Sequence, residues 1–139
     1  MFNKILLASD GSEHSLRATE KAIVLCENNP NASITVVYVV DTATAKTDVL
    51  SEGNLEDREL MRKHRLAPTE KLISAANIPH DIKLIKGEPG PSIVTFSNEN
   101  NFDIVVIGSC GLNGLQEMVL GSVSHKVAKR AIAPVLIVK

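Results

Sequence analysis

Short runs of apolar residues recur along the chain, and the segments between them have a different spacing. Residues 5–8, 104–107 and 135–138 are uninterrupted apolar runs, and residues 34–40 are rich in β-branched side chains. Continuous runs of this length are typical of strands that are buried on both faces, as in parallel sheets covered by helices. Residues 81–86 instead alternate in part between polar and apolar, which predicts a more exposed strand at an edge of the sheet.

The segments between these runs place apolar residues three and four positions apart, which is the spacing of amphipathic helices. The first predicted helix begins after Ser12, whose hydroxyl suits an N-cap. A second helical region extends from about residue 51 to residue 76 and contains Pro68. Proline lacks the backbone N–H that a helix interior needs, so we expect this helix to be kinked or broken near Ala67.

Two further helices are predicted in the second half of the chain. One begins at Pro89 or Pro91, because proline is favoured in the first turn of a helix. The other covers about residues 122–131, and its periodicity predicts that Val127 and Ile132 face inward. Strand and helix therefore alternate along the whole chain. This predicts an α/β fold: a single doubly wound, five-stranded parallel sheet with helices on both faces.

Length and composition fit one globular domain and argue against several classes of partner. The 139 residues are predicted to form a single domain, residues 1–139, in which residues 41–54 are expected to be a flexible loop. A net charge of -1 and an aromatic content of 3% argue against binding to nucleic acid or to an anionic membrane surface. The two cysteines, and apolar runs shorter than the roughly 18 residues of a membrane span, predict a cytoplasmic protein.

A ligand site is expected where the carboxyl ends of the central strands meet. In doubly wound sheets ligands bind beyond these ends, at the point where the strand order reverses. The apolar runs at 5–8 and 104–107 are followed by Asp10 and by a glycine-rich segment that starts at Gly108. A carboxylate that faces backbone N–H groups suits the ribose and the phosphates of a nucleotide. The glycines and Ser122 are equally consistent with ordinary turns and a helix N-cap.

The spacing Gly108-x2-Gly111-x9-Gly121-Ser122 resembles the nucleotide-binding signature of the universal stress protein family. Residues 4–12 are also similar to the beginning of that family, and the resemblance extends over the whole chain. It implies the strand order 3-2-1-4-5 and the subgroup of the family that binds ATP.

The resemblance also implies a role for each residue of the expected site. Asp10 is implied to bind the ribose, either directly or through water or a metal ion. The residues implied to line the adenine pocket are Ala8, Ser9 and Val39, and those implied to surround the ribose and phosphates are Gly108, Ser109, Gly111, Gly121, Ser122, Val123 and Ser124. The implied ligand is ATP or AMP, together with Mg²⁺. The implied partner is a second copy of the chain, paired through the apolar edge strand Val135–Val138.

One departure from the family pattern leaves the ligand and the function open. The residue after the second signature glycine, often basic in the family, is Leu112, and no lysine or arginine occurs from Gly108 to His125. Phosphate would then be held by backbone amides, hydroxyl groups and Mg²⁺, and AMP or a cyclic nucleotide remains an alternative to ATP. The favoured hypothesis is an ATP-binding regulatory module of the stress response, without an assigned catalytic residue. The alternative is a slow Mg²⁺-dependent ATPase or a phosphoryl or nucleotidyl transferase.

Overall fold

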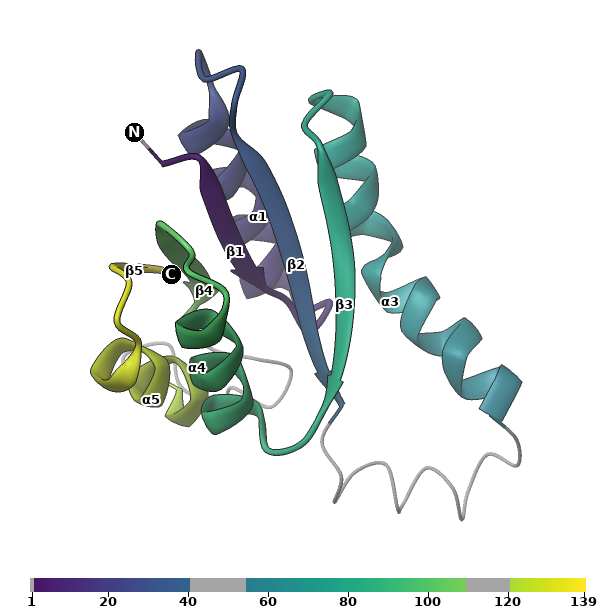
Figure 1. The fold of residues 1–139 in the computed structure, drawn as a ribbon. Helices are drawn as coiled ribbons and strands as arrows, with labels where there is room; N and C mark the ends of the chain where they lie inside the picture. The colour runs from purple at the N-terminus through teal and green to yellow at the C-terminus, as the bar shows by residue number, and fades with distance from the viewer. Residues whose placement is uncertain (1, 41–54, 110–120) are drawn as a thin grey trace.

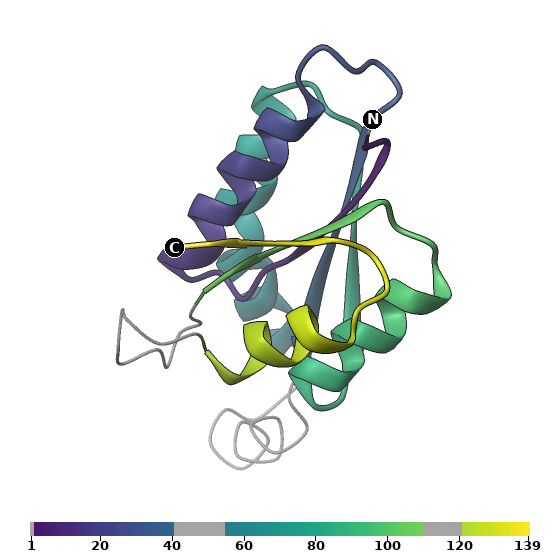
Figure 2. The same ribbon diagram turned by 90° about the vertical axis from the view of Figure 1, so that its left-hand side faces the viewer.

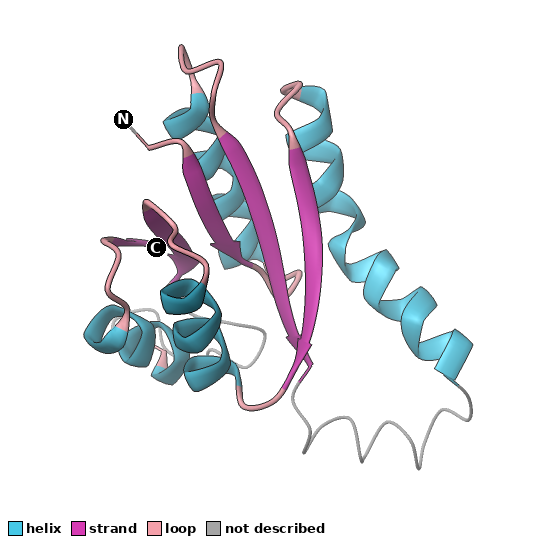
Figure 3. Cartoon of the chain, in the orientation of Figure 1, coloured by secondary structure: helices cyan, strands magenta, loops and turns pink. Residues whose placement is uncertain are grey.

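Strands and helices alternate along the chain as the periodicity predicts (Figure 3). The structure is a computed structural model that describes residues 2–40, 55–109 and 121–139, without the side chains of residues 55–62. The strands are β1 (Lys4–Ala8), β2 (Ser33–Val40), β3 (His80–Lys86), β4 (Ile104–Gly108) and β5 (Val135–Val138), and the described helices are α1 (Glu13–Cys26), α3 (Leu55–Ala75), α4 (Pro89–Glu99) and α5 (Ser122–Arg130). The loop predicted at 41–54 lies outside the described residues.

The strands form one parallel sheet in the order β3-β2-β1-β4-β5, which confirms the predicted fold (Figure 1). The central strand is β1, in which Leu7 is aligned with Val36 of β2 and with Val106 of β4. Strands β2 and β3 lie on one side of β1, and β4 and β5 lie on the other. The direction in which successive strands are added therefore reverses between β1 and β4. Ligands of doubly wound sheets bind at such a reversal, beyond the carboxyl ends of the strands.

Helices cover both faces of the sheet, as Figure 2 shows from the side. Successive residues of β1 point to opposite faces. Ile5 and Leu7 pack with residues of α1 and α3, whereas Leu6 and Ala8 pack with residues of α4 and α5. Because both faces are covered, the central strands need apolar side chains at every position. This is the physical reason for the uninterrupted apolar runs in the sequence.

The edges of the sheet differ from its centre in the expected way. The outer strand β3 alternates between exposed and half-buried side chains, and Leu84 is 51% exposed. At the other edge, Val135, Leu136 and Ile137 of β5 are half-buried. The prediction that Ile132 faces inward is wrong, since its side chain is 84% exposed. Helical periodicity no longer applies at Ile132 because α5 ends at Arg130 and the chain then turns toward β5.

Helix α3 continues through Pro68, so of the kink or break predicted near Ala67 the break does not occur. The ribbon does change direction partway along the helix, as a kink at a proline requires (Figure 1). In the half of α3 that follows Pro68, Thr69 and Ile73 are fully buried, and Leu66, just before Pro68, is almost fully buried. This half of α3 is therefore packed on the sheet.

None of the described helices is long and apolar enough to cross a membrane.

Candidate functional site

The turn that follows β1 holds Asp10 at the carboxyl edge of the sheet. The backbone N–H of Ser9 donates to the carbonyl of Val37 at 3.0 Å, which continues the pairing of β1 with β2 beyond the end of the strand. The backbone N–H of Ser12 donates to Oδ1 of Asp10 at 2.9 Å, and that of Gly11 donates to Oγ of Ser9 at 3.3 Å. Short side chains thus satisfy successive backbone donors of the turn, as is typical of Asx and serine turns. They fix the position from which the carboxylate is presented.

Glycine is required at position 11 for two reasons. Its φ of +81° lies in the left-handed region, which side chains other than glycine rarely adopt. A Cβ atom at this position would also lie 2.9 Å from the carbonyl oxygen of Arg65 in α3. The turn that carries Asp10 is therefore in close backbone contact with α3.

Gly108 ends β4 and lets the first turn of α1 approach the strand. A Cβ atom at Gly108 would lie 2.9 Å from the backbone carbon, the carbonyl oxygen and the Cβ of His14. Helix α1 begins directly after the Asp10 turn, with Ser12 as the N-cap whose Oγ accepts the N–H of Ser15 at 3.3 Å. The first glycine of the signature thus has a packing function, and it brings the segments that follow β1 and β4 side by side.

The carbonyl oxygen of Ser109 anchors the start of α5 beside β4. It accepts the backbone N–H of Gly121 at 2.7 Å and the hydroxyl of Ser124 at 3.0 Å. The N–H of Ser109 donates in turn to the carbonyl of Val138 in β5 at 2.7 Å. The beginning of α5 is therefore held against the ends of β4 and β5, one strand away from the Asp10 turn.

The first turn of α5 has the geometry of an anion site. Its N-cap is Gly121, which has no side chain to cap the helix, and the first helical hydrogen bond runs from the N–H of His125 to the carbonyl of Gly121 at 3.0 Å. The N–H groups of Ser122, Val123 and Ser124 precede that bond, so they have no acceptor within the helix. No acidic side chain lies in this turn, and the helix dipole adds partial positive charge.

The hydroxyl of Ser124 has a structural use. Its Oγ lies 3.0 Å from the carbonyl oxygens of both Ser109 and Gly121, and the residue is buried. Since a hydroxyl has one proton, that proton is shared between two backbone carbonyls. Ser124 therefore offers an anion its backbone N–H, whereas the side chain of Ser122 is exposed.

Apolar side chains from three elements near the two segments pack in one cluster. Ala8 of β1, Val39 of β2 and Val123 of α5 belong to the same cluster of packed side chains, on the face of the sheet that α4 and α5 cover. The structure thus places the described residues predicted for adenine, for ribose and for phosphate near the carboxyl ends of the strands. Gly111 lies outside the described residues. Among the described residues no group of three His, Cys, Asp or Glu side chains could hold a metal ion.

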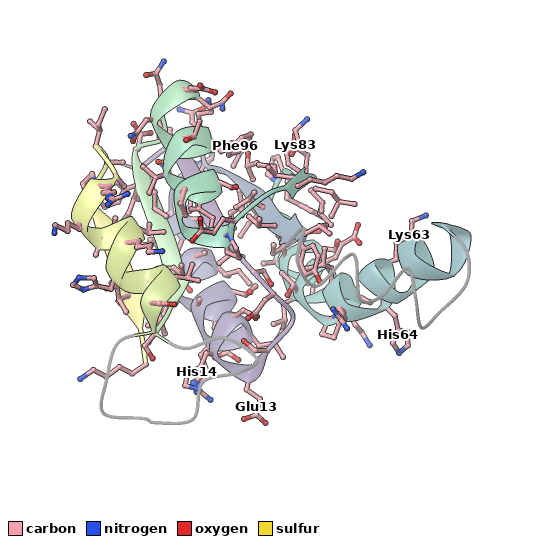
Figure 4. All side chains as sticks on the ribbon, turned by 90° about the horizontal axis from the view of Figure 1, so that it is seen from below. Glu13, His14, Lys63, His64, Lys83 and Phe96 are labelled. Carbon is pink, nitrogen blue, oxygen red and sulfur yellow. The ribbon has the colours of Figure 1, made fainter. Side chains whose placement is uncertain are left out.

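Positive charge reaches this side of the sheet from α1. Nη2 of Arg17 lies 2.9 Å from Nδ1 of His14, and Nε of Arg17 donates to the carbonyl oxygen of Lys139 at 3.0 Å. Because a guanidinium only donates, Nδ1 of His14 is the acceptor in this contact. Figure 4 views the molecule from the side where the strands end and shows His14 at the start of α1. The sequence of the glycine-rich segment gives no sign of this pair, because His14 and Arg17 lie in α1, about 100 residues earlier in the chain.

Comparisons with known proteins agree on one family. Residues 1–139 match the family described as "Universal stress protein family". Universal stress protein YxiE of Bacillus subtilis (strain 168) is 32% identical over 154 residues, and the match covers 100% of both chains. Among solved structures, hypothetical protein MJ0577 superimposes with a TM-score of 0.84 at 26% identity, covering 100% of this chain and 96% of that one.

Three more distant neighbours share the fold and were solved with adenine nucleotides. A universal stress protein in complex with cAMP has a TM-score of 0.70 at 24% identity and covers 99% of this chain and 97% of that one. The protein from Archaeoglobus fulgidus in complex with dAMP has a TM-score of 0.70 at 21% identity, covering 100% and 98%. That from Arabidopsis thaliana with AMP bound has a TM-score of 0.68 at 20% identity, covering 99% and 91%.

Proposed function

The chain belongs to the universal stress protein family, and from this premise we propose that it is a regulatory module that binds an adenine nucleotide between β1 and β4. The observation that carries the proposal is the placement of the Asp10 turn beside the uncapped first turn of α5. The strands before these two segments are neighbours in the sheet, and Gly108 lets the segments approach.

Each part of a nucleotide has a matching group at this edge of the sheet. The carboxylate of Asp10 accepts hydrogen bonds from the ribose hydroxyls. The backbone N–H groups of residues 122–124 donate to phosphate oxygens, as they do at other helix N-termini that bind phosphate. Ala8, Val39 and Val123 form an aliphatic wall for the adenine. Three structural neighbours were solved with cAMP, dAMP and AMP, which supports an adenine nucleotide as the ligand class.

We propose ATP with Mg²⁺ as the ligand in the cell, with AMP as the alternative. Each added phosphate brings negative charge, and no lysine or arginine lies between Gly108 and His125 to offset it. A triphosphate at this site therefore needs Mg²⁺, whereas a monophosphate is matched by the N–H groups and the helix dipole alone. The affinity for ATP should accordingly depend on Mg²⁺ more strongly than the affinity for AMP.

The test is to identify the nucleotide and then to remove its phosphate site. Purified protein is denatured and any released nucleotide identified by chromatography; titration calorimetry follows with ATP, AMP and cyclic AMP, with and without Mg²⁺. Gly121→Val should abolish binding, because its side chain covers the N–H groups of α5. The φ of -62° at Gly121 suits any residue, so the variant should fold. Gly121→Ala is the matched control and should keep binding, because its side chain is smaller and has no oxygen that would accept the N–H groups of α5.

Two outcomes decide between the hypotheses. The absence of binding to all three nucleotides by the wild-type protein would refute the proposed function. Release of phosphate from ATP well above the rate of Gly121→Val would instead favour the slow Mg²⁺-dependent ATPase.

We also propose that the protein is a cytoplasmic homodimer joined at β5. Among the strands that the structure describes, β5 is paired with β4 alone and lies at the edge of the sheet. Val135, Leu136 and Ile137 are half-buried in the single chain, and the exposed Ile132 precedes them. An apolar edge of this kind is prone to pair with another strand. A second copy of β5 satisfies the backbone groups and covers the side chains together.

A further inference from the structure

The buried hydroxyl of Thr69 in α3 contacts the turn that presents Asp10. Its Oγ1 lies 3.4 Å from Oγ of Ser9, at the long end of hydrogen-bonding distance, and Thr69 is 0% exposed while Ser9 is 6% exposed. The same Oγ of Ser9 accepts the backbone N–H of Gly11 at 3.3 Å. A path of two polar contacts therefore runs from α3 through Ser9 to the residue that follows Asp10.

A second contact joins α3 to the other side of Asp10. The carbonyl oxygen of Arg65, one helical turn before Thr69, lies where a Cβ of Gly11 would be 2.9 Å away. Nη1 of Arg65 also donates to the hydroxyl of Tyr38 in β2 at 3.0 Å, which fixes this part of the helix to the sheet. Thus α3 touches both neighbours of Asp10.

Because the hydroxyls of Thr69 and Ser9 are both buried, the loss of either one affects the Asp10 turn. Water cannot replace a lost partner at a site with so little exposure, so the removal of the Thr69 hydroxyl leaves the hydroxyl of Ser9 with its contact to the N–H of Gly11 and without its contact to α3. The hydroxyl of Ser9 accepts the N–H of Gly11 and contacts Oγ1 of Thr69, and these two contacts together set the rotamer of Ser9. A change at Thr69 is therefore transmitted to the turn without any contact between Thr69 and a ligand.

We propose that Thr69 is a positioning residue that holds the Asp10 turn for recognition of the ribose. This inference rests on the proposed function, in which the Asp10 carboxylate accepts from the ribose hydroxyls. Thr69 acts through Ser9 and the turn. Its contribution to the hydroxyls that Asp10 binds is measured by the preference for a ribose hydroxyl, because an effect that reaches the adenine through Ser9 changes the affinity for AMP and for its deoxy analogues alike.

The experiment measures the preference for a ribose hydroxyl. Titration calorimetry gives the Kd of AMP, 2′-deoxy-AMP and 3′-deoxy-AMP for the wild type, Thr69→Val and Thr69→Ser. Valine has the shape of threonine without its hydroxyl, and serine keeps the hydroxyl. Thr19→Val is the matched control, since Thr19 is also 0% exposed and its hydroxyl donates to the carbonyl of Ser15 within α1 at 2.7 Å.

We expect the wild type to bind AMP more tightly than at least one deoxy analogue. In Thr69→Val the ratio of the two Kd values should fall about tenfold, which corresponds to the loss of a hydrogen bond to a charged group. Thr69→Ser and Thr19→Val should keep it. A loss of stability lowers the affinity for AMP and for its analogues by the same factor, so the ratio separates positioning from mere packing. If Thr69→Val does not fold by circular dichroism, Thr69→Ala also lacks the hydroxyl and must show the same loss.

The results separate this inference from the proposed function. An unchanged ratio in Thr69→Val overturns the positioning role. A wild type that binds AMP and both deoxy analogues equally refutes ribose recognition by Asp10, and with it the inference, while nucleotide binding stands. A wild type that binds none of them refutes the proposed function itself.

Discussion

Replacing Gly108 with alanine tests whether this glycine is needed for packing independently of any ligand. The added Cβ would lie 2.9 Å from three atoms of His14, two of which belong to the backbone of α1. Carbon atoms in good contact are about 3.5–4.0 Å apart, so α1 or β4 must shift by about half an ångström or more. A helix backbone cannot rotate away as the end of a long side chain can. Overpacking of this kind costs about 1–3 kcal/mol.

The expected result is a lower melting temperature in the absence of nucleotide. For a chain of 139 residues, 1 kcal/mol corresponds to about 3–4 °C, so Gly108→Ala should melt about 3–10 °C below the wild type. Thermal melts followed by circular dichroism measure this, and urea unfolding gives the free energy directly. The control is Gly121→Ser, where φ is -62° and serine is a favourable N-cap, so stability should change by less than about 0.5 kcal/mol. Equal melting of Gly108→Ala and wild type would show that the close approach of α1 to β4 is wrong.

Three further predictions concern other parts of the molecule. Gly11→Ala should lower the free energy of unfolding by more than about 1 kcal/mol, because it combines a φ of +81° with the contact to Arg65; urea midpoints matching the wild type would contradict this. Backbone N–H groups of Lys4 and Asn3 donate to Oδ2 of Asp103 at 2.9 and 3.0 Å, and these hydrogen bonds lower the pKa of that carboxyl. The ionised carboxylate therefore stabilises the folded state above a pH of about 3.8, and this stabilisation is lost as the pH falls through the lower pKa of the folded state. Asp103→Asn should therefore be less stable than the wild type at neutral pH, with the gap closing in acid, and a gap that stays constant in urea titrations across this range would exclude the carboxylate as its cause. Sedimentation velocity at micromolar concentration should give a dimer, and a single species of 15.0 kDa would refute pairing through β5.

The general architecture could be predicted from the sequence because its signals are local. The apolar run at 5–8 predicts a strand covered on both faces, and the partial alternation at 81–86 predicts an edge strand; the structure has both. The strand order came from the resemblance to a family, since periodicity alone does not say which strands pair. Local signals also failed where an element ended: the periodicity of α5 was extended to Ile132, beyond the end of the helix.

The residues proposed for the site come from their position after the central strands and from the resemblance to a family, but neither source predicts the contacts that each residue makes. Gly108 is implied by the resemblance to lie beside the ribose and phosphates, and the structure shows that it also makes room for His14. Ser124 was expected near the ribose and phosphates, and its hydroxyl is bonded to two backbone carbonyls. The atoms that these two residues contact, those of His14 and the carbonyl oxygen of Ser109, belong to other segments of the chain. The spacing of glycines and serines contains no information about such contacts.

The sequence by itself determined the elements, the covered and exposed faces of the strands and the edge of the sheet where a ligand is expected. These properties follow from the order of polar and apolar residues within each segment. Only the tertiary structure decided that α3 contacts the Asp10 turn through Thr69 and Arg65, and that α1 brings Arg17 to the ends of the strands. The physical reason is that these contacts join residues that are distant in sequence. They depend on how each helix is placed on the sheet, which is set by the packing of the whole core.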